Sequence, residues 1–231
     1  MRVLKQALGL PITNLDDISS VKKNIGVRHS KLLPNSIRAI ICGPSGMGKT
    51  NIMMSLLFHP HGLRYENVYI YSKTLYQEKY ILLKKILDGI SGLGCYMFKD
   101  SDDIVEPSKA RPHSIFIFDD VATENQKMIR AYFSMGRHNS IDSFYLCQTY
   151  TRIPKHLIRD NANVLICFRQ DEMNLKHIFE DHVRGDFTFE KFKEICSICW
   201  DNDKYGTLVI MKDFDLSNGR YRKGFDNYIV T

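Results

Sequence analysis

The sequence contains no long hydrophobic run and no internal repeat or low-complexity tract. No stretch of eighteen or more apolar residues occurs in the 231 residues, so we expect no membrane-spanning helix. The first residues, Met1 to Ala7, lack the long apolar core of a signal peptide. The six cysteines are scattered along the chain. This arrangement favours reduced thiols inside a cell over a disulfide framework.

The composition is that of a globular protein with a mild positive charge. Hydrophobic residues make up 44 % of the chain, which is enough for one α/β domain with a good core. The formal net charge of +6 permits a nucleic-acid partner without requiring one. Because residues 1–35 are polar and basic, we expect them to form an arm. Residues 36–231 would then form the domain and a C-terminal extension.

One short segment has the pattern of a phosphate-binding loop. The letters GPSGMGKT, residues 43–50, fit G-x-x-x-x-G-K-[ST]. Glycines let the backbone turn tightly and direct its N–H groups at phosphate oxygens, and the following helix adds the positive end of its dipole. Lys49 can reach the β- and γ-phosphates, and the Thr50 hydroxyl can bind Mg²⁺. The predicted nucleotide-binding residues are Gly43, Pro44, Ser45, Gly46, Met47, Gly48, Lys49, Thr50 and Asn51.

Apolar runs typical of strands alternate with helical patterns along the chain. The expected strands are residues 37–42, 67–72, 94–98, 114–118, 141–147, 163–168 and 207–211, and an edge strand is expected within 219–230. The expected helices are residues 51–58, 77–87, 124–134, 174–182 and 189–198. Strands that alternate with helices predict an α/β fold with a doubly wound, mainly parallel sheet flanked by helices.

A second motif supplies carboxylates for the same site. The segment SIFIFDD, residues 114–120, is an apolar strand that ends in Asp119 and Asp120. At the C-terminal end of a parallel strand, Asp119 would face the phosphate loop and hold Mg²⁺. Asp120 could orient or deprotonate the attacking water. The alternative is an acidic strand end that only caps the next helix.

Two further polar residues flank the next predicted strand. Gln148 follows its end and could sense the γ-phosphate or the lytic water, although a turn glutamine is the alternative. Arg137 precedes the strand and could reach the γ-phosphate of a neighbouring subunit. The alternative for Arg137 is a surface arginine at a helix C-terminus, where a cation is favoured.

The order of these motifs resembles the FtsK–HerA group of DNA-pumping ATPases, which are P-loop NTPases of the ASCE, RecA-like class. The likeness is strongest to the genome-packaging ATPases of poxviruses, related large DNA viruses, virophages and Polinton-type elements. It rests on GPSGMGKT, IFIFDD and GRHNSIDSFYLCQTYTRIPKHLIRDNANVLICF, which run from about residue 36 to 168. A weaker likeness follows in YRKGFDNYIV.

The resemblance implies roles for the residues in these motifs. It places ATP and Mg²⁺ at Lys49 and Thr50, Mg²⁺ at Asp119 and the sensor at Gln148. It also implies an arginine that acts in trans, matched by Arg137, with Arg159 as the second candidate.

The acidic pair departs from the pattern of the group. Many members of the wider group carry Asp-Glu, whereas this chain has Asp119-Asp120. The shorter Asp120 reaches about one methylene less far, so Glu124 on the following loop is the alternative base.

The function implied is an ATP-hydrolysing ring that moves double-stranded DNA into a viral capsid. The partners would be duplex DNA, other copies of this chain and a capsid vertex protein. We expect the protein inside an infected host cell at the site of viral assembly, in nucleus or cytoplasm, or associated with the virion. Expected phosphate contacts are Lys73, Lys79, Arg220, Arg222 and Lys223.

Alternative functions and sites remain open at this point. A small-molecule kinase would need a lid rich in arginine, for which the sequence shows no cluster. A nucleotide switch would dock a partner and hydrolyse slowly. Cys196 and Cys199, with His177 and His182, could bind zinc, but their helical pattern favours buried structural cysteines.

Overall fold

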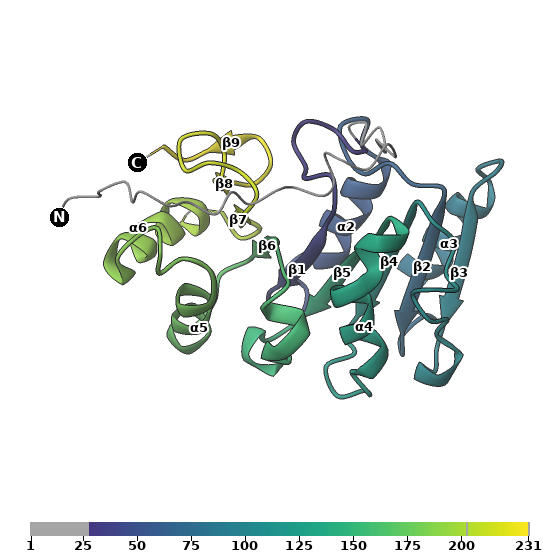
Figure 1. Ribbon diagram of the computed structural model, residues 1–231. Helices are drawn as coiled ribbons and strands as arrows, with labels where there is room; N and C mark the ends of the chain where they lie inside the picture. The colour runs from purple at the N-terminus through teal and green to yellow at the C-terminus, as the bar shows by residue number, and fades with distance from the viewer. Residues whose placement is uncertain (1–27, 202, 231) are drawn as a thin grey trace, which may run out of the picture.

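The computed structural model describes residues 28–201 and 203–230, which form one mixed sheet with helices on both faces (Figure 1). Its strands are β1 (Arg38–Cys42), β2 (Asn67–Ser72), β3 (Gly94–Phe98), β4 (Ser114–Asp119), β5 (Ile141–Cys147), β6 (Val164–Cys167), β7 (Leu208–Met211), β8 (Tyr221–Lys223) and β9 (Asn227–Tyr228). The main helices are α2 (Lys49–Phe58), α3 (Glu78–Asp88), α4 (Lys127–Met135), α5 (Glu172–His182) and α6 (Phe189–Trp200).

The strand order is β3-β2-β4-β5-β1-β6-β7-β8-β9. The pairs from β3 through to β6 are parallel, and the pairs from β6 to β9 are antiparallel. β5 therefore separates β1 from β4, and the register pairs Cys42 with Cys147 and Asp119 with Leu146. The ends of β1, β4 and β5 meet at one edge, and the predicted doubly wound, mainly parallel sheet is confirmed.

Two hydrophobic layers cover the faces of the sheet. In β4, Phe116 and Phe118 pack into the layer beneath α4, α5 and α6, whereas Ile115 and Ile117 pack into the layer beneath α2 and α3. This alternation follows from the two-residue period of a strand. The inner parallel strands β1, β2, β4 and β5 are buried on both faces, as continuous apolar runs predict, whereas the edge strand β3 is half-buried.

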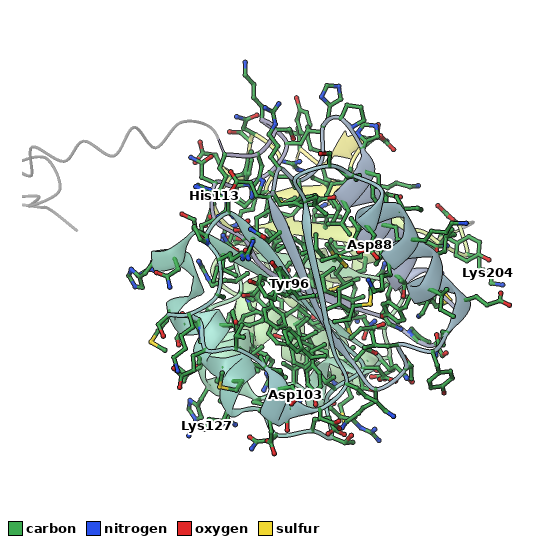
Figure 2. The ribbon with its side chains drawn as sticks, turned by 90° about the vertical axis from the view of Figure 1, so that its right-hand side faces the viewer. Asp88, Tyr96, Asp103, His113, Lys127 and Lys204 are labelled. Carbon is green, nitrogen blue, oxygen red and sulfur yellow. The ribbon has the colours of Figure 1, made fainter. Side chains whose placement is uncertain are left out.

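The free parallel edge of the sheet is β3 (Figure 2). Tyr96 lies in the middle of this edge strand and stacks on Tyr69 of β2, with ring centroids 4.6 Å apart. The opposite edge is β9, so the predicted C-terminal edge strand is present and is preceded by β8. No helix among the described residues is long and apolar enough to cross a membrane.

Residues 28–35 pack against the domain, which corrects the part of the predicted arm that the structure describes. His29 is 1 % exposed, and its Nε2 lies 2.8 Å from Asp142 Oδ2. Arg28 pairs with the same carboxylate at 3.0 Å. Leu33 joins the layer beneath α2 and α3. The basic residues were expected to belong to an arm, but a buried carboxylate in β5 binds two of them. Residues 1–27 lie outside the described residues.

Candidate nucleotide-binding site

The phosphate loop joins β1 to α2 and has the backbone that its glycines permit. Gly48, which precedes α2, has φ of 98°. Side chains with a Cβ rarely adopt this conformation, so glycine is needed there. A Cβ on Gly43 would approach the Phe168 ring to 2.8 Å, so that position is too crowded for any side chain. The N-terminus of α2, with its unpaired N–H groups and positive dipole end, begins directly after the loop.

Lys49 lies over its own loop. Its ammonium donates to Gly43 O at 2.7 Å and to Pro44 O at 3.0 Å. Burial lowers the pKa of Lys49, and Asp119 opposes that shift. The cation is therefore held beside the loop's backbone, at the place where the sequence predicted contacts with phosphate.

Asp119 ends β4 and is 5 % exposed. The Tyr80 hydroxyl of α3 donates to its Oδ2. Burial raises the pKa of Asp119, while the bond from Tyr80 and the charge of Lys79 oppose the rise. A buried carboxylate with so few cationic partners is a strong ligand for an added cation.

Lys79 occupies the space between Thr50 and Asp119. Its Nζ donates to Thr50 Oγ1 at 3.0 Å and lies 3.8 Å from Asp119 Oδ2. The sequence assigned Lys79 to the DNA contacts, but the structure places it in the nucleotide pocket. β2 and β4 are parallel neighbours, so the start of α3 lies at the edge where β4 ends. That placement depends on strand order, which the motif spacing does not encode.

Asp120 and Gln148 contact each other at the mouth of the pocket. Gln148 Nε2 donates to both carboxylate oxygens of Asp120 at 3.2 Å. Asp120 has φ of 56°, in the left-handed region that costs a residue with a side chain some strain. Both side chains are exposed to solvent. The structure therefore brings together the two residues predicted to act on the attacking water.

A cavity of about 310 Å³ joins these groups. It is lined by Ser45, Gly46, Gly48, Lys49, Thr50, Asn51, Thr74, Gln77, Lys79, Asp119, Asp120 and Gln148. Thr74, Gln77 and Lys79 were not predicted as site residues, because they come from the β2–α3 connection and the first turn of α3. Glu124 does not line the cavity. Its carboxylate lies 3.4 Å from Lys73 Nζ and accepts from the Tyr71 hydroxyl at 3.5 Å.

The two candidate trans arginines differ in accessibility. Arg137 is exposed in the short turn 136–139 before β5, at the sheet edge opposite the cavity. Arg159 is 9 % exposed, and its Nη1 pairs with Asp181 Oδ2 at 2.9 Å. The guanidinium also lies 5.0 Å from the centroid of the Tyr150 ring. Arg159 is therefore engaged in contacts within this chain, whereas Arg137 is exposed at the surface.

The zinc site that the sequence left open is not formed by the described residues. Cys196 and Cys199 are buried on α6, while His177 is exposed on α5. His182 bonds the Tyr150 hydroxyl at 2.7 Å, and burial lowers its pKa to about 3. Across residues 28–201 and 203–230, no group of three or more His, Cys, Asp and Glu residues is arranged to hold a metal ion.

The predicted basic tail is partly buried, which corrects one expected DNA contact. Arg222 is 5 % exposed, lies 4.7 Å from the centroid of the Phe214 ring and donates to Gly219 O at 2.7 Å. Arg220 pairs with Asp186 at 2.7 Å. Lys223 is half-buried at the end of β8. Arg222 stabilises the fold of this segment and cannot reach a phosphate backbone.

Comparison with solved structures shows the same fold. The genome packaging NTPase B204 from Sulfolobus turreted icosahedral virus 2 in complex with AMP is 16 % identical, with a TM-score of 0.51 over 77 % of this chain and 94 % of that chain. Its complex with sulfate gives 16 % identity and a TM-score of 0.53 over 77 % and 92 %. B204, the DNA-packaging ATPase from Sulfolobus Turreted Icosahedral Virus, gives 16 % and 0.51 over 78 % and 94 %.

A family model connects the sequence motifs to this fold. The model described as "Poxvirus A32 protein" matches residues 25–227, which is most of the chain. No curated protein matches the chain significantly. The predicted resemblance to viral DNA-packaging ATPases is confirmed at the level of family and fold, and this chain belongs to the poxvirus A32 family.

Proposed function

We propose that this protein is an ATPase that works as a ring and drives double-stranded DNA into a viral capsid. The observation that carries the proposal is the single cavity in which the phosphate loop, the end of β4 and Gln148 meet. B204, which has the same fold, has been solved in complex with AMP, AMPPCP and ATP-gammaS. B204 is a genome packaging NTPase of Sulfolobus turreted icosahedral virus 2.

The residues of the cavity fit Mg²⁺. Thr50 Oγ1 and Asp119 Oδ2 converge on one cation, the ammonium of Lys79, so the site already accommodates a positive charge between two oxygens. Hydroxyl and carboxylate oxygens are the ligands that Mg²⁺ prefers. When bound with ATP, Mg²⁺ would neutralise the charge that develops on the phosphates. The ammonium of Lys79 would then no longer contact Thr50 Oγ1 and Asp119 Oδ2. It would remain beside the phosphates as a second cation next to Lys49.

Asp120 and Gln148 would activate the attacking water. An Asp120 carboxylate oxygen would accept the proton of the water, and Gln148 would hold that carboxylate in place through its amide. Glu124 is the weaker candidate base. Its carboxylate is engaged by Lys73 and Tyr71 and does not line the cavity.

Arg137 would complete the site of a neighbouring subunit. It lies at the edge of the sheet opposite its own cavity, so it cannot serve its own phosphate loop. In a ring, an exposed arginine there could approach the γ-phosphate of the next subunit and stabilise the transition state. Such arginines contribute about 10³-fold or more to turnover. Duplex DNA would be held through its backbone by lysine and arginine, without reading base sequence.

A mixing experiment tests the trans role. Arg137→Ala should bind ATP and hydrolyse it poorly, and Lys49→Ala should fail to bind it. Mixed rings contain interfaces that join an intact phosphate loop to an intact arginine, so the mixture should recover activity that neither variant has alone. Arg159→Ala is a useful comparison, because its buried ion pair predicts a loss of stability without complementation. No recovery at ring-forming concentrations would contradict the role of Arg137.

Measuring ATPase rate with and without duplex DNA tests the function as a whole. A DNA motor should be stimulated by duplexes of any sequence, and its DNA affinity should fall steeply as salt rises. Turnover that ignores DNA would favour a nucleotide switch, and transfer of phosphate to a small acceptor would identify a kinase. The protein would act inside an infected cell, with a capsid vertex protein as its docking partner.

A further inference from the structure

Two neighbouring residues at the start of α3 approach the same carboxylate oxygen in different ways. Tyr80 is 2 % exposed, and its hydroxyl donates to Asp119 Oδ2. The side chain of Lys79 is 37 % exposed, and its Nζ lies 3.8 Å from that oxygen and 3.0 Å from Thr50 Oγ1. Tyr80 is also packed in the layer beneath α2 and α3. Tyr80 therefore fixes the carboxylate, whereas the Lys79 side chain has room to move.

The ammonium of Lys79 lies where the two oxygens proposed to bind Mg²⁺ converge. A lysine ammonium is a compact point charge that donates its hydrogen bonds to such oxygens. Mg²⁺ requires the same oxygens at about 2.0–2.1 Å in near-octahedral geometry. Thr50 Oγ1 and Asp119 Oδ2 therefore cannot bind both cations at once, and the Lys79 ammonium must move away before these oxygens can bind a metal ion.

The charges that line the cavity cancel. Its ionisable side chains are Lys49, Lys79, Asp119 and Asp120, so two positive charges face two negative ones. Mg²⁺ without a nucleotide would add positive charge beside two ammonium groups, and like charges at such short range repel. The phosphate oxygens of ATP instead accept charge-assisted hydrogen bonds from ammonium groups. The cavity therefore disfavours the metal ion alone and favours it together with phosphates.

We propose that Lys79 is an internal competitor of Mg²⁺, whose ammonium covers the metal-binding oxygens until the phosphates of a nucleotide bind it instead. The inference rests on the proposed function, because it presumes that Thr50 and Asp119 bind Mg²⁺ beside ATP. It adds a coupling between the two ligands: Lys79 makes the binding of metal and nucleotide cooperative, since phosphate draws the ammonium away from the oxygens that Mg²⁺ needs. Coupling between two sites typically changes affinity by about 5- to 150-fold.

Calorimetric titration of Mg²⁺ in the absence of nucleotide tests the competition. Lys79→Met removes the ammonium and keeps a long side chain, so this variant should bind Mg²⁺ about 5-fold or more tightly than the wild type. Lys79→Arg keeps the positive charge and should retain the weak binding of the wild type. Lys85→Met is the matched control, because Lys85 is exposed on the same helix and does not line the cavity. An unchanged or weaker Mg²⁺ affinity in Lys79→Met would overturn the competition.

Adding Asp119→Asn to Lys79→Met locates the metal ion. The double variant lacks the buried carboxylate that Lys79 approaches, so it should lose the gain in Mg²⁺ affinity that Lys79→Met shows. Asparagine can still accept from the Tyr80 hydroxyl, so the surroundings of the residue change little. A gain that persists in the double variant would show that Mg²⁺ binds elsewhere, and it would also overturn the competition at this site.

Titration of ATP in EDTA tests the transfer of the ammonium to phosphate, in conditions where no metal ion competes. Lys79→Met should bind ATP about 5-fold or more weakly than the wild type, whereas Lys79→Arg and Lys85→Met should bind it normally. Inorganic tripolyphosphate, which has the phosphates without the base, should show the same loss, because the lost contact is to phosphate. Equal ATP affinity in the wild type and in Lys79→Met would overturn the transfer.

The results separate failure of this inference from failure of the proposed function. A wild-type protein that binds ATP with Mg²⁺, and a Lys79→Met variant that matches it in both titrations, would overturn the role of Lys79 alone. A wild-type protein that binds ATP neither with Mg²⁺ nor in EDTA would overturn both proposals. A tighter Mg²⁺ affinity together with a weaker ATP affinity in Lys79→Met would support both, because opposite changes are what exchange of one cation for the other requires.

Discussion

Replacing Asp119 with asparagine should stabilise the protein and abolish its turnover. Asp119 is 5 % exposed at the end of β4, and its burial raises the pKa of the carboxyl group. The charged form therefore costs free energy in the folded protein. Asparagine has nearly the same shape and can still accept from the Tyr80 hydroxyl, but it carries no charge. It should therefore be the more stable residue at a position that we propose for binding Mg²⁺.

The structure sets the size of the effect through two opposing contributions. Asparagine loses the attraction to Lys79, but the ions are 3.8 Å apart and Lys79 is 37 % exposed. Such a screened pair contributes about 0–1 kcal/mol. Removal of the buried charge should exceed this, for a net gain of about 1 kcal/mol, which lies within the range of single stabilising substitutions. In a chain of this length that gain raises Tm by about 2–4 °C.

The pH dependence has a definite sign. Because the folded pKa of Asp119 is raised above its unfolded value, the folded state binds the proton more tightly. Wild-type stability is therefore lost as pH rises from about 4, the ordinary pKa of aspartate, through the folded pKa. The stability difference between Asp119→Asn and wild type should be near zero at pH 4 and should grow to a plateau above the folded pKa.

Thermal melts in EDTA between pH 4 and pH 8, with ATPase rates measured in parallel, provide the assay. Asp120→Asn is the control, because the exposed Asp120 should change the free energy of unfolding by less than about 0.5 kcal/mol. A lower Tm for Asp119→Asn at pH 7.5 would show that Lys79 and Tyr80 outweigh the cost of burial. Retained Mg²⁺-dependent turnover would show that another carboxylate binds the metal.

Three further predictions follow from the geometry. Lys49→Ala should remove nucleotide binding in calorimetry, because it removes the cation held over the loop; a folded variant with normal turnover would contradict this. Asp120→Asn should lower kcat by about 10²-fold with ATP still bound, whereas Glu124→Gln should change it little; the reverse order in steady-state kinetics would move the base to the loop. Asp142→Ala should cost about 3–5 kcal/mol in urea unfolding, because it leaves the buried His29 and its neighbour without a carboxylate; unchanged stability would show that residues 28–35 do not hold the domain.

The sequence by itself determined the parts of this protein that are local. The phosphate loop between β1 and α2 was predictable, because its glycines, lysine and threonine lie next to one another in the chain. The acidic end of β4 was predictable for the same reason, since an apolar run of strand length ends in carboxylates. The parallel sheet followed from the alternation of strands and helices.

Only the tertiary structure decided which distant segments complete the site. Lys79 and Tyr80 reach Thr50 and Asp119 because β2 pairs with β4, and no motif in the sequence encodes that pairing. Burial also distinguishes the two arginines. Arg222 is buried and stabilises the fold, whereas Arg137 is exposed at the surface. The physical reason is that a residue's charge and shape are local properties, whereas its burial and its partners depend on how all the strands are ordered and packed.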